Sequence, residues 1–312
     1  MEANTEGQAG VAQEFQSPRK PRTASDGERR AAHAPRPVPG GGPSAARIWI
    51  LIPALDEEQA LPLVLSEIPS ELVDGVLVVD NGSRDATAAV AAAAGALVVH
   101  EPRRGYGSAC LAGLAALLGE PSQGSPEARG EEVESGSRAA MESTPGAQPP
   151  ADIIVFLDAD HSDYPGELER IIAPILDGQA DLVIGSRILG GASRAALLPQ
   201  AWFGNRLACL LMRILFRVRY TDLGPFRAIR TQSLERLHMS DKGFGWTIEM
   251  QLKAHSAGLT VREVPVSYRS RIGQSKITGT LSGTLGAGTK IIGWILAWRL
   301  TSWCQGSTRS GE

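Results

Sequence analysis

The stretch that decides the fold is FLDADHSDYP, residues 156–165, in which an apolar run ends in two carboxylates one residue apart. Residues 152–157 predict a buried strand, and residues 165–176 predict the helix that follows it. Asp158 and Asp160 therefore lie just beyond a strand end. Two like charges this close repel each other, and both stay ionised only with solvent or a cation between them.

The segments around this stretch repeat the same alternation of strand and helix. Apolar runs predict strands at residues 48–52, 75–79, 97–100, 182–185 and about 261–266, and helical patterns occupy residues 58–68, 85–94 and 109–118. Such alternation predicts an α/β fold with a mostly parallel sheet flanked by helices. Ligands of such sheets bind beyond the carboxyl ends of the strands, where Asp80 and Asp158 fall.

Composition divides the chain into three parts. Residues 1–45 are rich in Gly, Pro, Ala and charge without apolar periodicity, which predicts a disordered tail. Residues 46–280 form the predicted folded domain, interrupted by a low-complexity polar insertion at about 120–150. Residues 281–312 are predicted to form a C-terminal amphipathic helix and tail.

The totals of the sequence exclude several classes of protein. A net charge of −3 over 312 residues gives no general basic field for binding nucleic acid. The three cysteines are widely spaced and form no CxxC pair, so neither a disulfide framework nor a structural zinc site is indicated. The N-terminus lacks the apolar segment of a secretory signal, and a cytoplasmic location is expected.

The carboxylate pair has two interpretations. A divalent Mg²⁺ or Mn²⁺ ion takes carboxylate and diphosphate oxygens, so Asp158 and Asp160 suit chemistry on a nucleoside diphosphate. The alternative is a solvated strand end in which Asp160 or Ser162 caps the next helix. Other residues at the ends of the first two strands, all but Pro53 polar, favour a binding site: Pro53, Asp56, Glu57, Asp80, Asn81 and Ser83.

Five motifs occur in an order that resembles a known family: PALDEE, VVDNGSRDAT, RRGYGSA, FLDADHSDYP and GSR. Over residues 47–280 the chain resembles family-2 glycosyltransferases of the GT-A (Rossmann-like) fold, and most of all the dolichol-phosphate mannose synthase and polyprenyl-phosphate glycosyltransferase group. The resemblance implies inversion at the anomeric carbon and metal binding by Asp158 and Asp160. It also implies nucleotide-sugar binding by Pro53, Leu55, Glu57, Asp80, Asp158 and Ala159.

The second half of the domain supplies cations and a further acid. Arg187 follows a strand and has the donor geometry for the diphosphate, the alternative being a surface ion pair. By resemblance, Arg271 and Lys276 lie beside the acceptor or the phosphates, although a solvated basic face would have the same composition. Asp222 lies in the region that matches the family's D-x-x-x-G-F-R motif, with Gly224 and Pro225 departing from the usual residues.

The acceptor decides whether a general base is needed. A phosphate monoester is already an oxyanion at neutral pH, whereas a hydroxyl must lose a proton. For a hydroxyl acceptor, Asp222 is the preferred base ahead of Glu249. The predicted catalytic residues are thus Asp160, Arg187 and Asp222, and the predicted residues for the acceptor or its phosphate are Arg187, Arg271 and Lys276.

Two apolar segments bear on membranes. Residues 286–303 carry Trp294, Trp298 and Trp303 with Lys290 and Arg299 near the ends, a pattern that predicts peripheral attachment to a membrane surface. The alternative is a helix that packs on the domain or pairs with another copy. For residues 208–218 a core helix is predicted.

The sequence therefore predicts a metal-dependent hexosyltransferase on the cytoplasmic membrane face. GDP-mannose or a UDP-hexose is the expected donor, and a polyprenyl phosphate or another lipid-linked molecule the expected acceptor. One alternative is a phosphohydrolase of the haloacid-dehalogenase type, with Asp158 as nucleophile and Asp160 as acid. The other is a catalytically silent glycosyltransferase-like subunit that binds membrane.

Overall fold

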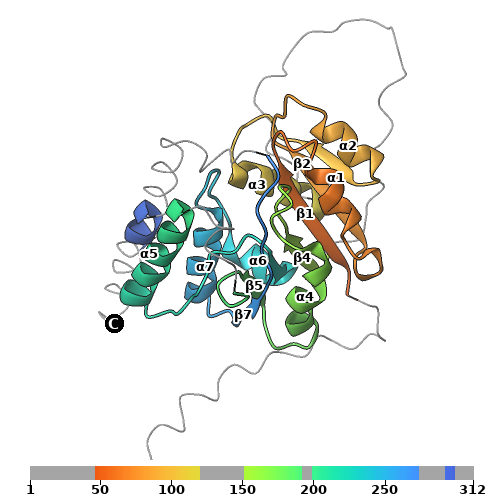
Figure 1. The fold of residues 1–312 in the computed structure, drawn as a ribbon. Coiled ribbons are helices and arrows are strands. Elements are labelled where there is room, and N and C mark those ends of the chain that lie inside the picture. Colours follow the sequence, from red (N-terminus) through yellow and green to blue (C-terminus); the bar gives the residue numbers. More distant parts are fainter. Residues whose placement is uncertain (1–45, 120–150, 192–198, 274–291, 299–312) are drawn as a thin grey trace, which may run out of the picture. The chain divides into compact units, whose positions relative to one another are not determined.

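Seven strands form one mixed sheet in the part of the chain that the computed structural model describes, residues 46–119, 151–191, 199–273 and 292–298 (Figure 1). The strand order is β3-β2-β1-β4-β6-β5-β7, and only β6 runs antiparallel to its neighbours. The strands are β1 (Ile48–Ala54), β2 (Gly75–Asp80), β3 (Leu97–His100), β4 (Ile153–Phe156), β5 (Leu182–Ser186), β6 (Arg227–Arg230) and β7 (Val261–Pro265). The predicted mostly parallel sheet is confirmed.

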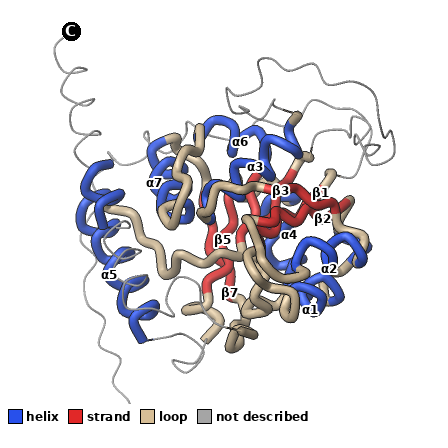
Figure 2. The backbone as a smooth tube through the Cα atoms, turned by 90° about the horizontal axis from the view of Figure 1, so that it is seen from above, coloured by secondary structure: helices blue, strands red, loops and turns tan. Residues whose placement is uncertain are grey.

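The interior strand β1 is buried along its whole length because helices cover both faces of the sheet (Figures 1 and 2). Ile50 and Ile52 pack against α1, α2 and α4, whereas Trp49 and Leu51 point to the opposite face and pack against α3, α6 and α7. The helices are α1 (Leu61–Ser66), α2 (Thr87–Ala93), α3 (Tyr106–Leu118), α4 (Leu168–Leu176), α6 (Thr231–Leu237) and α7 (Trp246–Ser256), with 3₁₀ turns at Ser70–Leu72 and Pro165–Glu167.

Strand β6 and helix α6 are the elements that the sequence patterns did not predict. β6 is the tetrapeptide RAIR, whose two arginines hide the short apolar centre from a hydrophobicity pattern. Arg227 is nevertheless fully buried, because backbone carbonyls of Leu223, Gly224 and Thr247 accept its hydrogen bonds. β1 also continues through Pro53, beyond its predicted end. A proline is tolerated in the strand there because the hydrogen-bonded ladder with β4 ends at Leu51, before the residue that lacks an amide hydrogen.

Helix α5 (Pro199–Phe216) is longer than the predicted core helix at residues 208–218. One face packs with α7 and with the helical residues 292–298 around Ala208, Met212 and Ile295. The opposite face exposes large apolar side chains, so the prediction of a core helix is wrong for that face. Among the described residues, none of the helices has the length and apolar character that a membrane span requires.

Several sequence predictions lie outside the described residues. These are the tail at residues 1–45, the insertion at about 120–150, and most of the C-terminal segment, including Lys290, Arg299 and Trp303. The described part of that segment packs on the domain. Trp294 donates to Asp241 at 2.7 Å and Trp298 donates to Ser256 at 3.1 Å, as the packing alternative predicts.

Candidate functional site

A cavity of about 520 Å³ lies at the carboxyl ends of β1 and β4. Its walls come from the segment after β1, the start of α3, the segment after β4 and two later loops. The lining residues are Pro53, Ala54, Leu55, Glu57, Asn81, Arg104, Gly105, Tyr106, Ala109, Asp158, Ala159, Asp160, Gly243, Phe244 and Arg271. Six predicted nucleotide-sugar, metal or catalytic residues therefore share one cavity: Pro53, Leu55, Glu57, Asp158, Ala159 and Asp160.

The loops after β1 and β2 fix Glu57 at this cavity. Asp56 adopts a left-handed backbone conformation, with φ of 52°. Its amide donates to the Ser83 hydroxyl at 3.0 Å, and its carboxylate accepts from the Arg84 amide at 2.7 Å. The Glu57 amide in turn donates to the Thr87 hydroxyl at 2.8 Å. These contacts hold two loops that are distant in sequence at one edge of the sheet.

Asp80 lies at the end of β2 but does not line the cavity. Its carboxylate accepts from the Ser83 amide at 3.0 Å and lies 3.1 Å from Nδ1 of His100. Burial acts to raise the pKa of Asp80, but the hydrogen bonds from Ser83 and His100 outweigh burial and lower it. The neighbouring Asn81 lines the cavity instead. The predicted role of Asp80 in binding the nucleotide sugar stays a prediction.

The two carboxylates of the opening motif differ in environment. Burial raises the pKa of Asp158 to about 6, and the charge of Asp160 adds to this rise. The Tyr106 hydroxyl donates to Asp158 Oδ1 at 3.0 Å and partly offsets it. Asp160 Oδ1 accepts from the Ser162 amide at 2.9 Å. Burial and the charge of Asp160 therefore outweigh the Tyr106 hydrogen bond and the positive charges of Arg271 and Arg187, which act to lower this pKa.

Among the residues that the structure describes, Arg271 forms an ion pair with Asp160. Its Nη1 lies 3.1 Å from Asp160 Oδ2, and its Nη2 donates to Glu57 Oε1 at 3.1 Å. The backbone holds it there, because the Ile272 amide donates to the Asp160 carbonyl at 3.0 Å. Arg271 thus joins the segment after β7 to the segments after β1 and β4. Its predicted role beside the acceptor or the phosphates stays a prediction.

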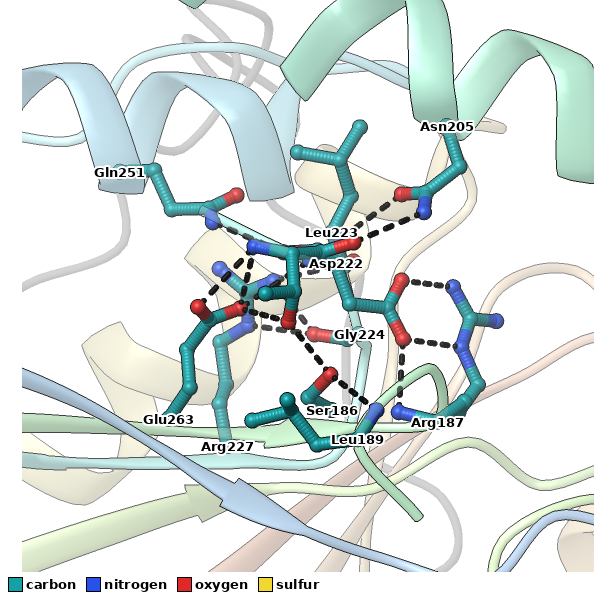
Figure 3. Close-up of polar contacts among 11 residues, drawn as sticks. Ser186, Arg187, Leu189, Asn205, Asp222, Leu223, Gly224, Arg227, Gln251 and Glu263 are labelled. Carbon is teal, nitrogen blue, oxygen red and sulfur yellow. Dashed lines mark hydrogen bonds and ion pairs between the residues drawn. The ribbon is translucent and has the colours of Figure 1, made fainter. Parts of the chain in front are cut away.

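Arg187 and Asp222 lie outside the cavity lining and bind each other (Figure 3). Nε and Nη2 of Arg187 donate to the two carboxylate oxygens of Asp222 at 2.8 and 2.7 Å, and the Arg187 amide donates at 2.8 Å. Asp222 is fully buried. Burial acts to lower the pKa of Arg187, but Asp222 raises it above its usual value. The predicted roles in phosphate binding and base catalysis stay predictions.

Glu249, the second candidate base, is also buried, and its carboxylate is engaged in hydrogen bonds and an ion pair. It accepts from the Ser240 amide and hydroxyl and from the Asp241 amide, at 2.8 to 2.9 Å. Lys253 lies 2.7 Å from its carboxylate. These bonds hold the loop at residues 240–245, which carries Gly243 and Phe244 into the cavity wall. Lys276, the remaining predicted site residue, lies outside the described residues.

Three large lining side chains were not among the predicted site residues: Arg104, Tyr106 and Phe244. The RRGYGS segment carried a signal for two of them, because Gly105 has φ of 147° and opens α3 at the cavity. Phe244 had no such signal, since its loop reaches the cavity only by docking on α3. The amides of Gly107 and Ser108 donate to the carbonyls of Gly243 and Lys242 at 3.0 and 3.1 Å.

This docking requires a glycine at position 107. A Cβ there would lie 1.9 Å from the Asp241 carbonyl oxygen, and that backbone could not move without breaking the loop contact. We expect Gly107→Ala to lower the free energy of unfolding by about 1–3 kcal/mol. Gly204→Ala in α5 is the matched control, because nothing lies within 4 Å of its Cβ and alanine favours helix. Urea unfolding measures both, and equal stabilities would show that the loop does not dock this way.

The carboxylates fit a divalent cation in donor type. Asp158 and Asp160 supply hard oxygen ligands, and a bound cation would offset the charge of Asp160 that helps to raise the pKa of Asp158. Among the described residues, no group of three or more His, Cys, Asp or Glu side chains converges on one point. A cation held here would therefore take its other ligands from water or from phosphate oxygens of a bound molecule.

Comparison with known proteins gives three consistent likenesses. The model of the family "Glycosyl transferase family 2" matches residues 49–120 and 147–237. An uncharacterised glycosyltransferase of Mycobacterium tuberculosis is 35% identical over 243 residues, which cover 76% of this chain and 93% of that protein. The polyprenol monophosphomannose synthase of Mycolicibacterium smegmatis is 30% identical over 247 residues, with coverage of 75% and 82%.

The fold resembles a solved structure of glucosyl-3-phosphoglycerate synthase from Mycobacterium tuberculosis. The TM-score is 0.59 at 22% sequence identity, over 82% of this chain and 80% of that one. That protein was crystallised with Mn²⁺, UDP-glucose and phosphoglyceric acid. The likeness confirms the predicted GT-A fold.

Proposed function

Because this chain belongs to glycosyl transferase family 2, we propose that it transfers a hexose, with inversion, from a nucleotide-diphosphate sugar to a polyprenyl phosphate or another lipid-linked acceptor. The chain is a glycosyltransferase that uses a nucleotide sugar, which excludes the phosphohydrolase alternative and disfavours a silent subunit. One observation carries the proposal that a nucleotide-diphosphate sugar binds here: a single cavity is lined by Glu57, Asp158, Asp160 and Arg271.

The reaction is a substitution at the anomeric carbon. An acceptor oxygen forms the new bond to this carbon, while the bond to the diphosphate oxygen breaks and the nucleoside diphosphate leaves with the electron pair. A bound Mg²⁺ or Mn²⁺ would neutralise charge on the leaving diphosphate, and Mn²⁺ accompanies UDP-glucose in the similar synthase. Asp158 and Asp160 are the residues that would hold it.

The remaining residues bind and orient. Pro53, Leu55 and Glu57 would contact the nucleoside, and Arg271 would place a positive charge beside the phosphates of donor or acceptor. A phosphate acceptor is already ionised and attacks once oriented, so it needs no protein base. This agrees with Asp222 and Glu249, the two candidate bases, being engaged in buried ion pairs.

The acceptor and the location belong to this proposal. The polyprenol monophosphomannose synthase of Mycolicibacterium smegmatis, by its name, acts on a polyprenol phosphate, and that likeness supports a lipid-linked acceptor. The predicted cytoplasmic, membrane-peripheral location follows from such an acceptor together with a nucleotide-sugar donor.

Donor binding is the first test. We expect GDP-mannose, UDP-glucose or another UDP-hexose to raise the melting temperature of the protein in the presence of Mn²⁺ or Mg²⁺. EDTA should abolish this rise. A donor at 100 times its Kd stabilises the native state by about 2.7 kcal/mol. Transfer is then measured with a polyprenyl phosphate and with 3-phosphoglycerate as a soluble acceptor that bears both a phosphate and a hydroxyl. If no donor changes the melting temperature, the proposed function is wrong; if only 3-phosphoglycerate accepts, the lipid acceptor is wrong.

A further inference from the structure

The outward face of α5 is apolar although nothing among the described residues covers it. Phe203, Leu210 and Ile214 are 64%, 50% and 63% exposed. At 100° per residue these three side chains fall within about 40° of one another on the helix surface. They form a single stripe, called here the α5 stripe, on the side opposite the buried Ala208 and Met212.

The charges along this helix have one sign. Residues 199–219 contain four arginines (Arg206, Arg213, Arg217 and Arg219) and no acidic residue, in a chain whose net charge is −3. All four arginines are exposed. Arg206 and Arg213 lie about 40–100° to one side of the stripe. Arg206 also lies over the Trp202 ring, 4.8 Å from its centroid. An apolar stripe with a cationic flank is the composition of a helix that lies in a membrane interface.

Helix α5 is hydrogen-bonded to the segment that carries Asp222, beside the Arg187–Asp222 pair (Figure 3). Its Asn205 accepts from the Leu223 amide at 2.9 Å and donates to the Thr221 carbonyl at 3.4 Å, on either side of Asp222. α5 and the helical residues 292–298 lie together beyond α7 at the edge of the domain (Figure 1). A surface that binds α5 would thus hold the domain in one orientation.

We propose that the α5 stripe and its arginines dock the protein on a membrane surface rich in anionic phospholipid. The proposal rests on the proposed function, since a lipid-linked acceptor gives such docking its use. A second copy of the chain is a poorer occupant: a two-fold contact through this face would gather the arginines of both α5 helices around one interface, and residues 199–219 offer no acidic partner for them. Anionic headgroups match those arginines, and the acyl region near the headgroups accommodates the stripe.

Vesicle binding of the full chain tests the docking without any turnover. We expect sedimentation with vesicles of phosphatidylcholine and 30% phosphatidylglycerol, and weak sedimentation with pure phosphatidylcholine or in 0.5 M NaCl. Each arginine near the surface contributes about fivefold, so Arg206→Gln/Arg213→Gln should reduce binding about 25-fold. Leu210→Ser/Ile214→Ser should reduce it by at least about tenfold.

Leu176→Ser is the matched control, because Leu176 is 49% exposed on α4, which covers the other face of the sheet. It should bind vesicles like the wild type. Melting temperatures exclude misfolding, and donor-induced thermal shifts should stay unchanged in every variant. The proposal would be overturned if the wild-type protein did not bind anionic vesicles, or if the α5 variants bound them as well as the wild type does.

Light scattering decides between membrane and self-association. A wild-type dimer that Ile214→Ser converts to a monomer would assign the stripe to a second copy and overturn the proposal. Failure of the proposed function would look different, because the vesicles would still bind while no nucleotide sugar shifted the melting temperature.

Discussion

Asp158→Asn should raise the melting temperature of the protein while reducing glycosyl transfer by at least about a hundredfold. Burial and the nearby Asp160 raise the pKa of Asp158 to about 6, so its ionised form at neutral pH costs folding free energy. Asparagine removes that charge and still accepts from the Tyr106 hydroxyl at Oδ1. We expect a gain of at most about 2 kcal/mol, discounted because the carboxylate partly faces the cavity.

The raised pKa of Asp158 determines how the free energy of unfolding changes with pH. The folded state favours protonated Asp158, so its stabilising contribution is complete below pH 3.8 and is lost as the pH rises through about 6. In Asp158→Asn this part of the slope of unfolding free energy against pH disappears. Urea unfolding from pH 4 to 7.5 measures it for both proteins.

Asp160→Asn is the paired variant and should behave differently. Asp160 binds Arg271 at 3.1 Å, and its replacement leaves that guanidinium with a weaker partner at the cavity. We expect a comparable loss of transfer without a gain in stability. If Asp158→Asn kept full activity with Mn²⁺ and donor, the two carboxylates would not form the diphosphate site.

The sequence predicted the site best where strand ends determine it. Asp158 and Asp160 follow an apolar run, and Glu57 follows another, so a parallel sheet brings them to one edge. The docking of Phe244 could not be predicted, because it depends on close backbone approach between α3 and a loop more than 130 residues later. The exposed face of α5 was missed for a different reason: hydrophobicity alone does not reveal which side of an apolar helix meets the domain.

The pairing of Arg187 with Asp222 also could not be predicted from the sequence. Each follows a strand or loop end, and each fits a catalytic role when considered alone. Only the fold shows that β5 and the segment before β6 place their polar groups in one buried network, with Ser186, Thr221 and Glu263 bonded around the pair (Figure 3).

Asp222→Ala should destabilise the protein by about 3–5 kcal/mol, because it leaves the largely buried guanidinium of Arg187 without its counterion. The Arg187 amide would lose its acceptor as well. Replacing both partners, as Arg187→Met/Asp222→Leu, removes the uncompensated charge and keeps similar side-chain volumes. We therefore expect the double variant to regain most of the lost stability, and a double-mutant cycle in urea measures the coupling.

The stable double variant then separates a positioning role from a chemical one. Both residues lie outside the cavity lining, and Arg187 directs its Nε and one Nη at Asp222, so we expect transfer to a phosphate acceptor to stay within about tenfold of the wild type. A hundredfold fall in kcat, at wild-type melting temperature and with donor binding unchanged, would contradict this. It would instead support the sequence prediction that Arg187 binds the diphosphate or that Asp222 acts as base. A loss confined to hydroxyl acceptors would identify Asp222, because only those acceptors must give up a proton.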